Sequence, residues 1–166
     1  MMRKLTRTIH ILAVCIFVGS IPAHIVLGQL ANSHLIGGGT METFAAYQQA
    51  KYGLTIGLTT AGIILTLLSG VALVIRRKPL LRQNWLRAKL CVVAAIAING
   101  AAVLTPLAEQ MRDLAVAAVE TGALDAAFHA AENTEAIAGA INLALIVVAI
   151  ALAVFKPQLR IRAEAA

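Results

Sequence analysis

Charged and aromatic residues are both scarce in this chain of 166 residues. Only 13% of the residues are charged, whereas a soluble globular domain carries roughly 25%. Aromatic residues make up 4%, so the hydrophobic 60% of the sequence consists mainly of alanine and aliphatic side chains. This composition excludes an ordinary soluble domain. It favours helices that pack through small residues within a membrane.

Cysteine and the common catalytic motifs are scarce as well. Cys15 and Cys91 both lie in apolar segments, so we interpret them as small buried hydrophobic residues and not as a disulfide framework. The chain has no nucleophile motif, no phosphate-binding loop and no paired carboxylates within a span. Since every acid is expected outside a span, a proton-driven transporter is also disfavoured.

Long apolar runs are abundant, and they predict the fold. The mean hydropathy is +0.83. A helix needs about 20 apolar residues to cross the hydrocarbon core of a membrane. We therefore expect an all-α, four-transmembrane-helix bundle in a single domain, residues 1–166. The spans are expected at about 6–30, 52–75, 84–107 and 134–155, with the third and fourth helices extending into the periplasm.

The distribution of charge predicts the orientation of this bundle. Twelve of the fourteen Lys and Arg residues lie within residues 3–7, 76–89 and 156–162, and all acids except Glu164 lie in the first and third connections. The positive-inside rule then places both termini in the cytoplasm, so the chain is N-in and C-in. We expect a multi-pass protein of the bacterial inner membrane. The basic clusters indicate contact with the lipid bilayer, and no motif supports binding to nucleic acid.

Two histidines, His10 and His24, interrupt the first apolar run. Fourteen helical positions separate them, which places both on one helix face about 21 Å apart. Ionisable groups inside a span are costly and are therefore functional candidates. Structural roles are the alternative. Pro22 is expected to kink the helix and free the carbonyl of Val18 for His24, whereas His10 could bond a carbonyl or headgroup at the interface.

The spacing of these histidines leads to a haem hypothesis. One of them, or each of them, would ligate a haem b, and the second ligand would come from another helix unless the iron stays five-coordinate. His129 is the candidate partner for His24, and Lys89 is the candidate partner for His10. Such a protein would transfer electrons to or from a quinone, and if it is an enzyme it would be a membrane oxidoreductase.

A metal site is the second hypothesis for the histidines. His129 and Glu132 lie three residues apart on one helix face, so both could reach one ion. Imidazole and carboxylate ligands suit copper, zinc or iron. The alternative for His129 is an acidic, solvated helix end in which the histidine is incidental. The alternative for His34 is a loop histidine without a role. The further candidate ligands are His24, His34 and Glu135, with Met41 and Met111 for copper(I).

The second span carries small residues that predict close helix packing. Gly53 and Gly57 form a small-xxx-small pair. This face could hold a homo-oligomer together or join the chain to a larger membrane complex as an accessory subunit. Asn99 and Asn142 are predicted at similar depth on adjacent helices. We interpret them as interhelical hydrogen-bonding residues, with a substrate site as the alternative.

Three short segments resemble known membrane families. They are HILAVCIFVG (His10–Gly19), WLRAKL (Trp85–Leu90) and VFKP (Val154–Pro157). Together they resemble a family of uncharacterised four-span bacterial predicted integral membrane proteins, and more distantly the copper-resistance D domain and the HemJ-type membrane proteins. The resemblance implies a functional role for His10 and Lys89, associated with haem in the HemJ type. It also leaves transport of copper or another small solute open.

Overall fold

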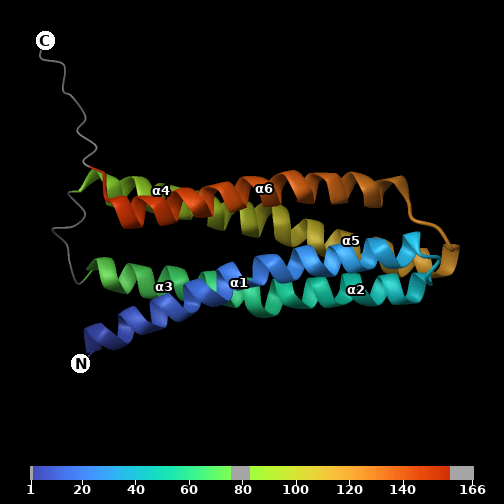
Figure 1. The fold of residues 1–166 in the computed structure, drawn as a ribbon, viewed down its shortest axis with the longest axis horizontal. Helices are drawn as coiled ribbons and strands as arrows, with labels where there is room; N and C mark the ends of the chain where they lie inside the picture. Colours follow the sequence, from blue (N-terminus) through green and yellow to red (C-terminus); the bar gives the residue numbers. More distant parts are fainter. Residues whose placement is uncertain (1, 76–82, 158–166) are drawn as a thin grey trace, which may run out of the picture.

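The computed structural model describes residues 2–75 and 83–157, and they form four long helical rods (Figure 1). No strand occurs among these residues, so the all-α prediction is confirmed. Each of the four rods is long and apolar enough to cross a membrane. Rod 1 is α1 (Met2–Ile36); rod 2 joins α2 (Met41–Leu54), the π-helical η1 (Thr55–Thr60) and α3 (Ala61–Ile75); rod 3 joins α4 (Asn84–Asn99), the π-helical η3 (Gly100–Leu104) and α5 (Thr105–Thr121); rod 4 is α6 (Ala126–Phe155).

The rods run in alternating directions, which gives the bundle two distinct ends (Figure 1). The basal end carries the start of α1, the end of α3, the start of α4 and the end of α6. The distal end carries the connections from α1 to α2 and from α5 to α6. Much of the basic sequence lies in residues 76–82 and 158–162, outside the described residues. The N-in and C-in orientation stays a prediction.

Helix ends at the distal end follow local capping chemistry. The Asp125 carboxylate accepts a hydrogen bond from the backbone N–H of Ala127 at 2.9 Å, which caps the start of α6. Gly122 ends α5 with a φ of +73°, a left-handed conformation that glycine adopts without strain. The sequence alone predicts Asp125 as an N-cap and Gly122 as a helix stop, and the structure confirms both predictions.

The connection between the first two rods is much shorter than the sequence predicted. The expected spans leave residues 31–49 as a connection, with a turn at Gly37–Gly39 and a short surface helix over 41–50 as an option, yet α1 continues to Ile36 and α2 runs from Met41 to Leu54. Packing explains the difference, because Phe44 and Ala45 on this segment are buried against the other rods. Rods 1 and 2 therefore extend distally as far as rods 3 and 4 do (Figure 1).

A compact core holds the rods together at the distal end. The helices α1 and α2, α2 and α5, and α5 and α6 pack against one another there. The rings of Phe44 and Phe128 meet edge to face, with centroids 5.4 Å apart, and neither side chain is exposed. We call this cluster the distal core; its members are Ala31, Phe44, Ala45, Met111, Ala115, Phe128 and Ala131.

The basal half is organised as two helix pairs. In one pair α1 packs closely on α3, and a Cβ atom at Gly62 would meet the backbone of Phe17 at 2.9 Å. In the other pair α4 packs on α6. Figure 1 shows the two pairs separating toward the basal end. Phe17 bridges them by packing with Ile96 and Ile146, while many Ile, Leu and Val side chains on the outer faces are exposed and suited to lipid.

Candidate functional site

A cleft of about 810 Å³ lies between the two helix pairs, and Phe17 forms part of its wall. All four rods contribute to its wall. Most of the wall is aliphatic, for example Ile21, Ile63, Leu104 and Leu143. Small-molecule sites in proteins typically enclose roughly 300–1,000 Å³, so the cleft has the capacity for a ligand.

Polar side chains gather at the distal part of this cleft. At about 1.5 Å of rise per residue, His24 lies ~30 Å along α1 from Lys4, and Glu135 lies ~30 Å along α6 from Phe155. The hydrocarbon core of a membrane is about 30 Å thick. If the basal end lies at one membrane surface, this polar cluster lies near the opposite surface. The aliphatic part of the cleft then extends into the hydrocarbon region.

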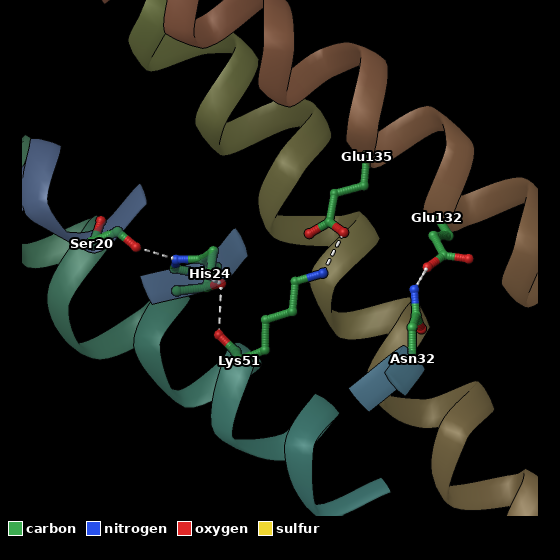
Figure 2. A network of polar contacts seen from close by, with 7 residues as sticks. Ser20, His24, Asn32, Lys51, Glu132 and Glu135 are labelled. Atoms are coloured by element: carbon green, nitrogen blue, oxygen red, sulfur yellow. Dashed lines mark hydrogen bonds and ion pairs between the residues drawn. The ribbon is translucent and has the colours of Figure 1, made fainter. Parts of the chain in front are cut away.

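An ion pair between rods 2 and 4 is the strongest polar contact in the cleft. Lys51 Nζ donates to Glu135 Oε2 at 2.5 Å, and the two side chains are only 9% and 18% exposed. Figure 2 shows the two side chains extending toward each other from α2 and α6. Removal of one partner would leave the other charge buried and uncompensated. The direct contact between the two side chains also constrains the spacing of rods 2 and 4.

His24 connects rod 1 to rod 2 within the same cluster. Its Nδ1 bonds the carbonyl of Ser20 at 2.8 Å, and its Nε2 lies 2.9 Å from Thr55 Oγ1. Figure 2 shows His24 between Ser20 and Lys51. A carbonyl can only accept, so Nδ1 carries a proton. The expected bond from His24 to the carbonyl of Val18 is therefore replaced by one to Ser20.

The Thr55 hydroxyl gives His24 two consistent protonation states. Thr55 Oγ1 also lies 3.1 Å from the backbone carbonyl of Lys51. With Nε2 unprotonated, it accepts a hydrogen bond from the Thr55 hydroxyl. With Nε2 protonated, it donates to Thr55 Oγ1, and the Thr55 hydroxyl donates to Lys51 O. The ring keeps its contacts to Ser20 and Thr55 in both states.

Two π-helical segments shape the walls of the cleft. In η1, Thr60 Oγ1 donates to the carbonyl of Thr55 at 2.8 Å, and Thr59 Oγ1 donates to Ser20 Oγ at 2.9 Å. In η3, Gly100 and Leu104 line the cleft from rod 3. Short π segments inside α-helices frequently mark functional sites. Their presence in both rods 2 and 3 supports a functional role for the cleft.

Asn142 is a buried cleft residue with an unsatisfied polar atom. It is 8% exposed, it lines the cleft, and its Oδ1 has no hydrogen-bond partner. Asn99 differs, because its Nδ2 donates to the carbonyl of Ala138 across the α4–α6 interface at 3.0 Å. The prediction of interhelical hydrogen bonding is confirmed for Asn99.

The residues predicted to form a metal site are not gathered in one place. His129 Nδ1 lies 3.7 Å from Glu132 Oε2, and Glu132 Oε1 accepts from Asn32 at 2.8 Å (Figure 2). His34, in the distal part of rod 1, instead packs its ring against Tyr47 of α2. Within residues 2–75 and 83–157, no group of three or more His, Cys, Asp or Glu side chains could hold a metal. The predicted combination of His24, His34, His129 and Glu132 is therefore not found.

Further candidate residues lie outside the cleft. His34 fills the first turn, where a Cβ atom at Gly39 would overlap its imidazole. Met111 packs in the distal core, so it is not part of a copper(I) site with His129. Neither position is among the residues that line the cleft. The described cleft wall contains no Met or Cys side chain.

His10 forms a separate site near the basal end. Its Nδ1 lies 2.9 Å from Ser69 Oγ, whose hydroxyl donates to the carbonyl of Leu65. The single Ser69 proton can go either to this carbonyl or to Nδ1 of His10, and the tautomer of His10 follows from that choice. His10 and His24 both bond to rod 2, as their shared helix face predicts. Only His24 belongs to the cleft.

Lys51 is the cleft residue that the sequence interpretation missed. It is one of two cations outside the three basic clusters, the other being Arg112. It also belongs to a polar stripe on rod 2 that continues through Thr55 and Thr59 at helical spacing. A similar stripe on rod 4 joins Glu135 to Asn142, seven residues on. Such stripes on otherwise apolar helices are the signal that could have identified the site.

Comparison with known proteins gives one match. A family model described as "Predicted integral membrane protein (DUF2269)" matches residues 4–157, which is nearly the whole chain. No curated protein and no solved structure matched the sequence. The match supports the first resemblance drawn from the sequence. The likenesses to the copper-resistance D domain and to HemJ-type proteins stay hypotheses.

Proposed function

We propose that this chain, which belongs to the DUF2269 family of predicted integral membrane proteins, binds a neutral, lipid-soluble molecule of the quinone type in the cleft between its helix pairs. One observation carries the proposal. A cleft of about 810 Å³ combines an aliphatic wall with a hydrogen-bonded polar cluster at its distal part. Sites of this composition bind molecules with an apolar body and a few polar atoms.

The charges of the cleft favour a neutral ligand. The charged residues of the described wall are Lys51, Glu132 and Glu135. Lys51 is paired with Glu135, so Glu132 leaves an excess of one negative charge when His24 is neutral. An anionic headgroup would meet repulsion there, because electrostatic interactions are strong where water is scarce. This argues against an anionic phospholipid and for an uncharged head.

The donors of the polar cluster suit the oxygen atoms of a quinone. Lys51 Nζ has three N–H donors and uses one for Glu135, which leaves two for a ligand carbonyl. The aliphatic wall suits an isoprenoid-like tail. The proposal concerns binding. Electron transfer would also require a redox partner for the bound molecule.

Direct binding to the purified protein tests this proposal. In nanodiscs, we expect one molecule of decylubiquinone to bind per chain in a saturable way. Gly139 lines the cleft and has no atom within 4 Å of a Cβ position, so Gly139→Leu should fill the cleft without a clash and abolish binding. Gly19→Leu is the matched control, because Gly19 is exposed, equally unobstructed and outside the cleft. Equal uptake by both variants, or only non-saturable partitioning, would contradict the proposal.

Haem b at His10 is a second candidate function. Its specific support is the orientation of the His10 imidazole, which is held near the basal end by the contact of its Nδ1 with Ser69 Oγ at 2.9 Å. His24 is less suited to ligation, because both of its ring nitrogens have partners. Lys89 on α4 would be the second ligand, and copper, zinc or iron at His10 would be the alternative to haem. Protein from haem-replete cells should show a Soret band that His10→Ala removes and His24→Ala retains; a colourless preparation would overturn this candidate.

Assembly is a third candidate, of a different class. Gly53 and Gly57 are exposed on rod 2, and neither has an atom within 4 Å of a Cβ position. This unobstructed face could pack against a second copy or a larger membrane complex. We expect Gly57→Leu to reduce the assembled mass measured by light scattering in detergent. An unchanged mass would count against assembly through this face.

A further inference from the structure

Gln48 is a buried residue of the cleft wall whose side-chain amide is unpaired. The residue is 3% exposed and lines the cleft from α2. Its amide makes no hydrogen bond within the part of the chain that the structure describes. Buried side-chain amides are ordinarily hydrogen-bonded, because an unsatisfied polar group is costly away from water. A ligand that bonds to this amide therefore gains affinity.

The amide of Gln48 opens into the cleft. Among the described residues, the unpaired side-chain N and O atoms that are closed to solvent belong to His34, Thr66 and Asn142. The amide of Gln48 is not among them, so its nitrogen and its oxygen both keep accessible surface. Since Gln48 lies on the buried face of α2 and lines the cleft, this surface faces the cleft.

Lys51 places a second hydrogen-bonding group beside this amide. Gln48 and Lys51 are three residues apart on one face of α2, so their side chains are neighbours. Lys51 keeps two N–H donors besides the one that it uses for Glu135. A polar head that reaches the ammonium group of Lys51 is therefore also within reach of the amide of Gln48.

We infer that Gln48 binds the polar head of the ligand and supports both redox forms of a quinone-type molecule. This inference rests on the proposed function. Nε2 of the amide donates to a quinone carbonyl, whereas Oε1 accepts from a quinol hydroxyl. The terminal torsion of a glutamine side chain is broad and roughly two-fold, so rotation presents either atom at the same position. Lys51 has donors only, so it lacks this second role.

A pair of neighbouring glutamine variants tests the inference under anaerobic conditions in nanodiscs. Gln48→Leu should lower the affinities for decylubiquinone and for decylubiquinol by about tenfold each. Gln49→Leu is the matched control, because Gln49 is exposed and outside the cleft, and it should leave both affinities unchanged. The thermal midpoint of ligand-free Gln48→Leu should be unchanged or higher, since an unpaired buried amide is removed. A purely structural role for Gln48 predicts the reverse, a lower midpoint with both affinities retained.

Infrared spectra of the bound quinone test the contact directly. A hydrogen bond lowers the stretching frequency of a carbonyl, so the carbonyl band should move to higher frequency in Gln48→Leu and stay in place in Gln49→Leu. Gln48→Met keeps the length of the side chain and should give the same result if leucine disturbs the fold. Unchanged affinities, an unchanged band, or an effect on only one redox form would each overturn the inference and leave quinone-type binding intact. If neither redox form binds to the wild-type protein, the proposed function itself has failed.

Discussion

The distal and basal halves of this bundle are held together in different ways. In the distal half, Phe44, Met111 and Phe128 are almost completely buried in a core to which all four rods contribute. In the basal half, the helices form two pairs, α1–α3 and α4–α6, with Phe17 as the main bridge and a cleft above it. Aliphatic side chains in this half are largely exposed on the outer faces.

If the basal half lies within the membrane and the distal half outside it, the two halves contact different solvents, and their packing differs for that reason. In water, burial of apolar surface drives helices together. In lipid the surroundings are as apolar as the side chains, so this force is absent and close packing depends on small residues and polar contacts. The distal core can therefore fix the rods while the basal half leaves room for a ligand. The Lys51–Glu135 pair lies at the junction of the two halves and connects rods 2 and 4 across the cleft.

The largest effect is expected from damage to the distal core. Phe128→Ala removes a fully buried ring from its contact with Phe44 and should lower the free energy of unfolding by about 4 kcal/mol. Phe155→Ala is the matched control near the basal end, where the ring is 79% exposed, and it should cause little change. Unfolding in mixed detergent micelles measures both. Similar losses in the two variants would remove the distinction between the halves.

A smaller effect is expected at the junction. Glu135→Leu leaves the Lys51 ammonium buried without its partner and should cost about 3 kcal/mol. The double variant Lys51→Met, Glu135→Leu replaces the pair by apolar side chains and should recover most of that loss. The same unfolding assay measures each. A double variant as unstable as Glu135→Leu would show that the pair itself, and not the uncompensated charge, is what the fold requires.

The smallest effect is expected between α1 and α3 in the basal half. Gly62→Leu would press a side chain into the backbone of Phe17 and should cost about 2 kcal/mol. Gly57→Leu, five residues earlier on the same rod, meets open space and should leave the stability of a single chain nearly unchanged. A thermal shift series on both variants checks this. If the order were reversed, helix contacts other than the described α1–α3 packing would control the basal half.

Predictions of local structure from the sequence were largely correct. The cap at Asp125 and the stop at Gly122 were predicted because each depends on a few neighbouring residues. The helical segment that begins at Met41 was underestimated. Its helix is stabilised by the burial of Phe44 against Phe128, which lies 84 residues further along the chain. Local propensity carries no information about such a contact.

The candidate site was predicted only in part. His24 was identified, because an ionisable residue in an apolar run is conspicuous by itself. Lys51 was not, since it lies at the edge of an apolar run, where a cation is ordinarily expected to reach the interface. The residues predicted for a metal site are likewise not gathered into one group among the described residues. His34 packs against Tyr47, whereas His129 lies near Glu132, and the sequence does not give the packing that decides these neighbours.

The sequence by itself determined the number of rods, their membrane-spanning character and several of their ends. These properties depend on local hydropathy and on hydrogen bonds between residues a few positions apart. Only the tertiary structure decided that Lys51 meets Glu135, that His24 meets Thr55, and that the oxygen of Asn142 is left without a partner. The first two are contacts between residues far apart in the chain, and the third is the lack of a hydrogen-bond partner, which no local pattern reveals. All three follow from how the rods pack, which depends on the whole set of side chains at once.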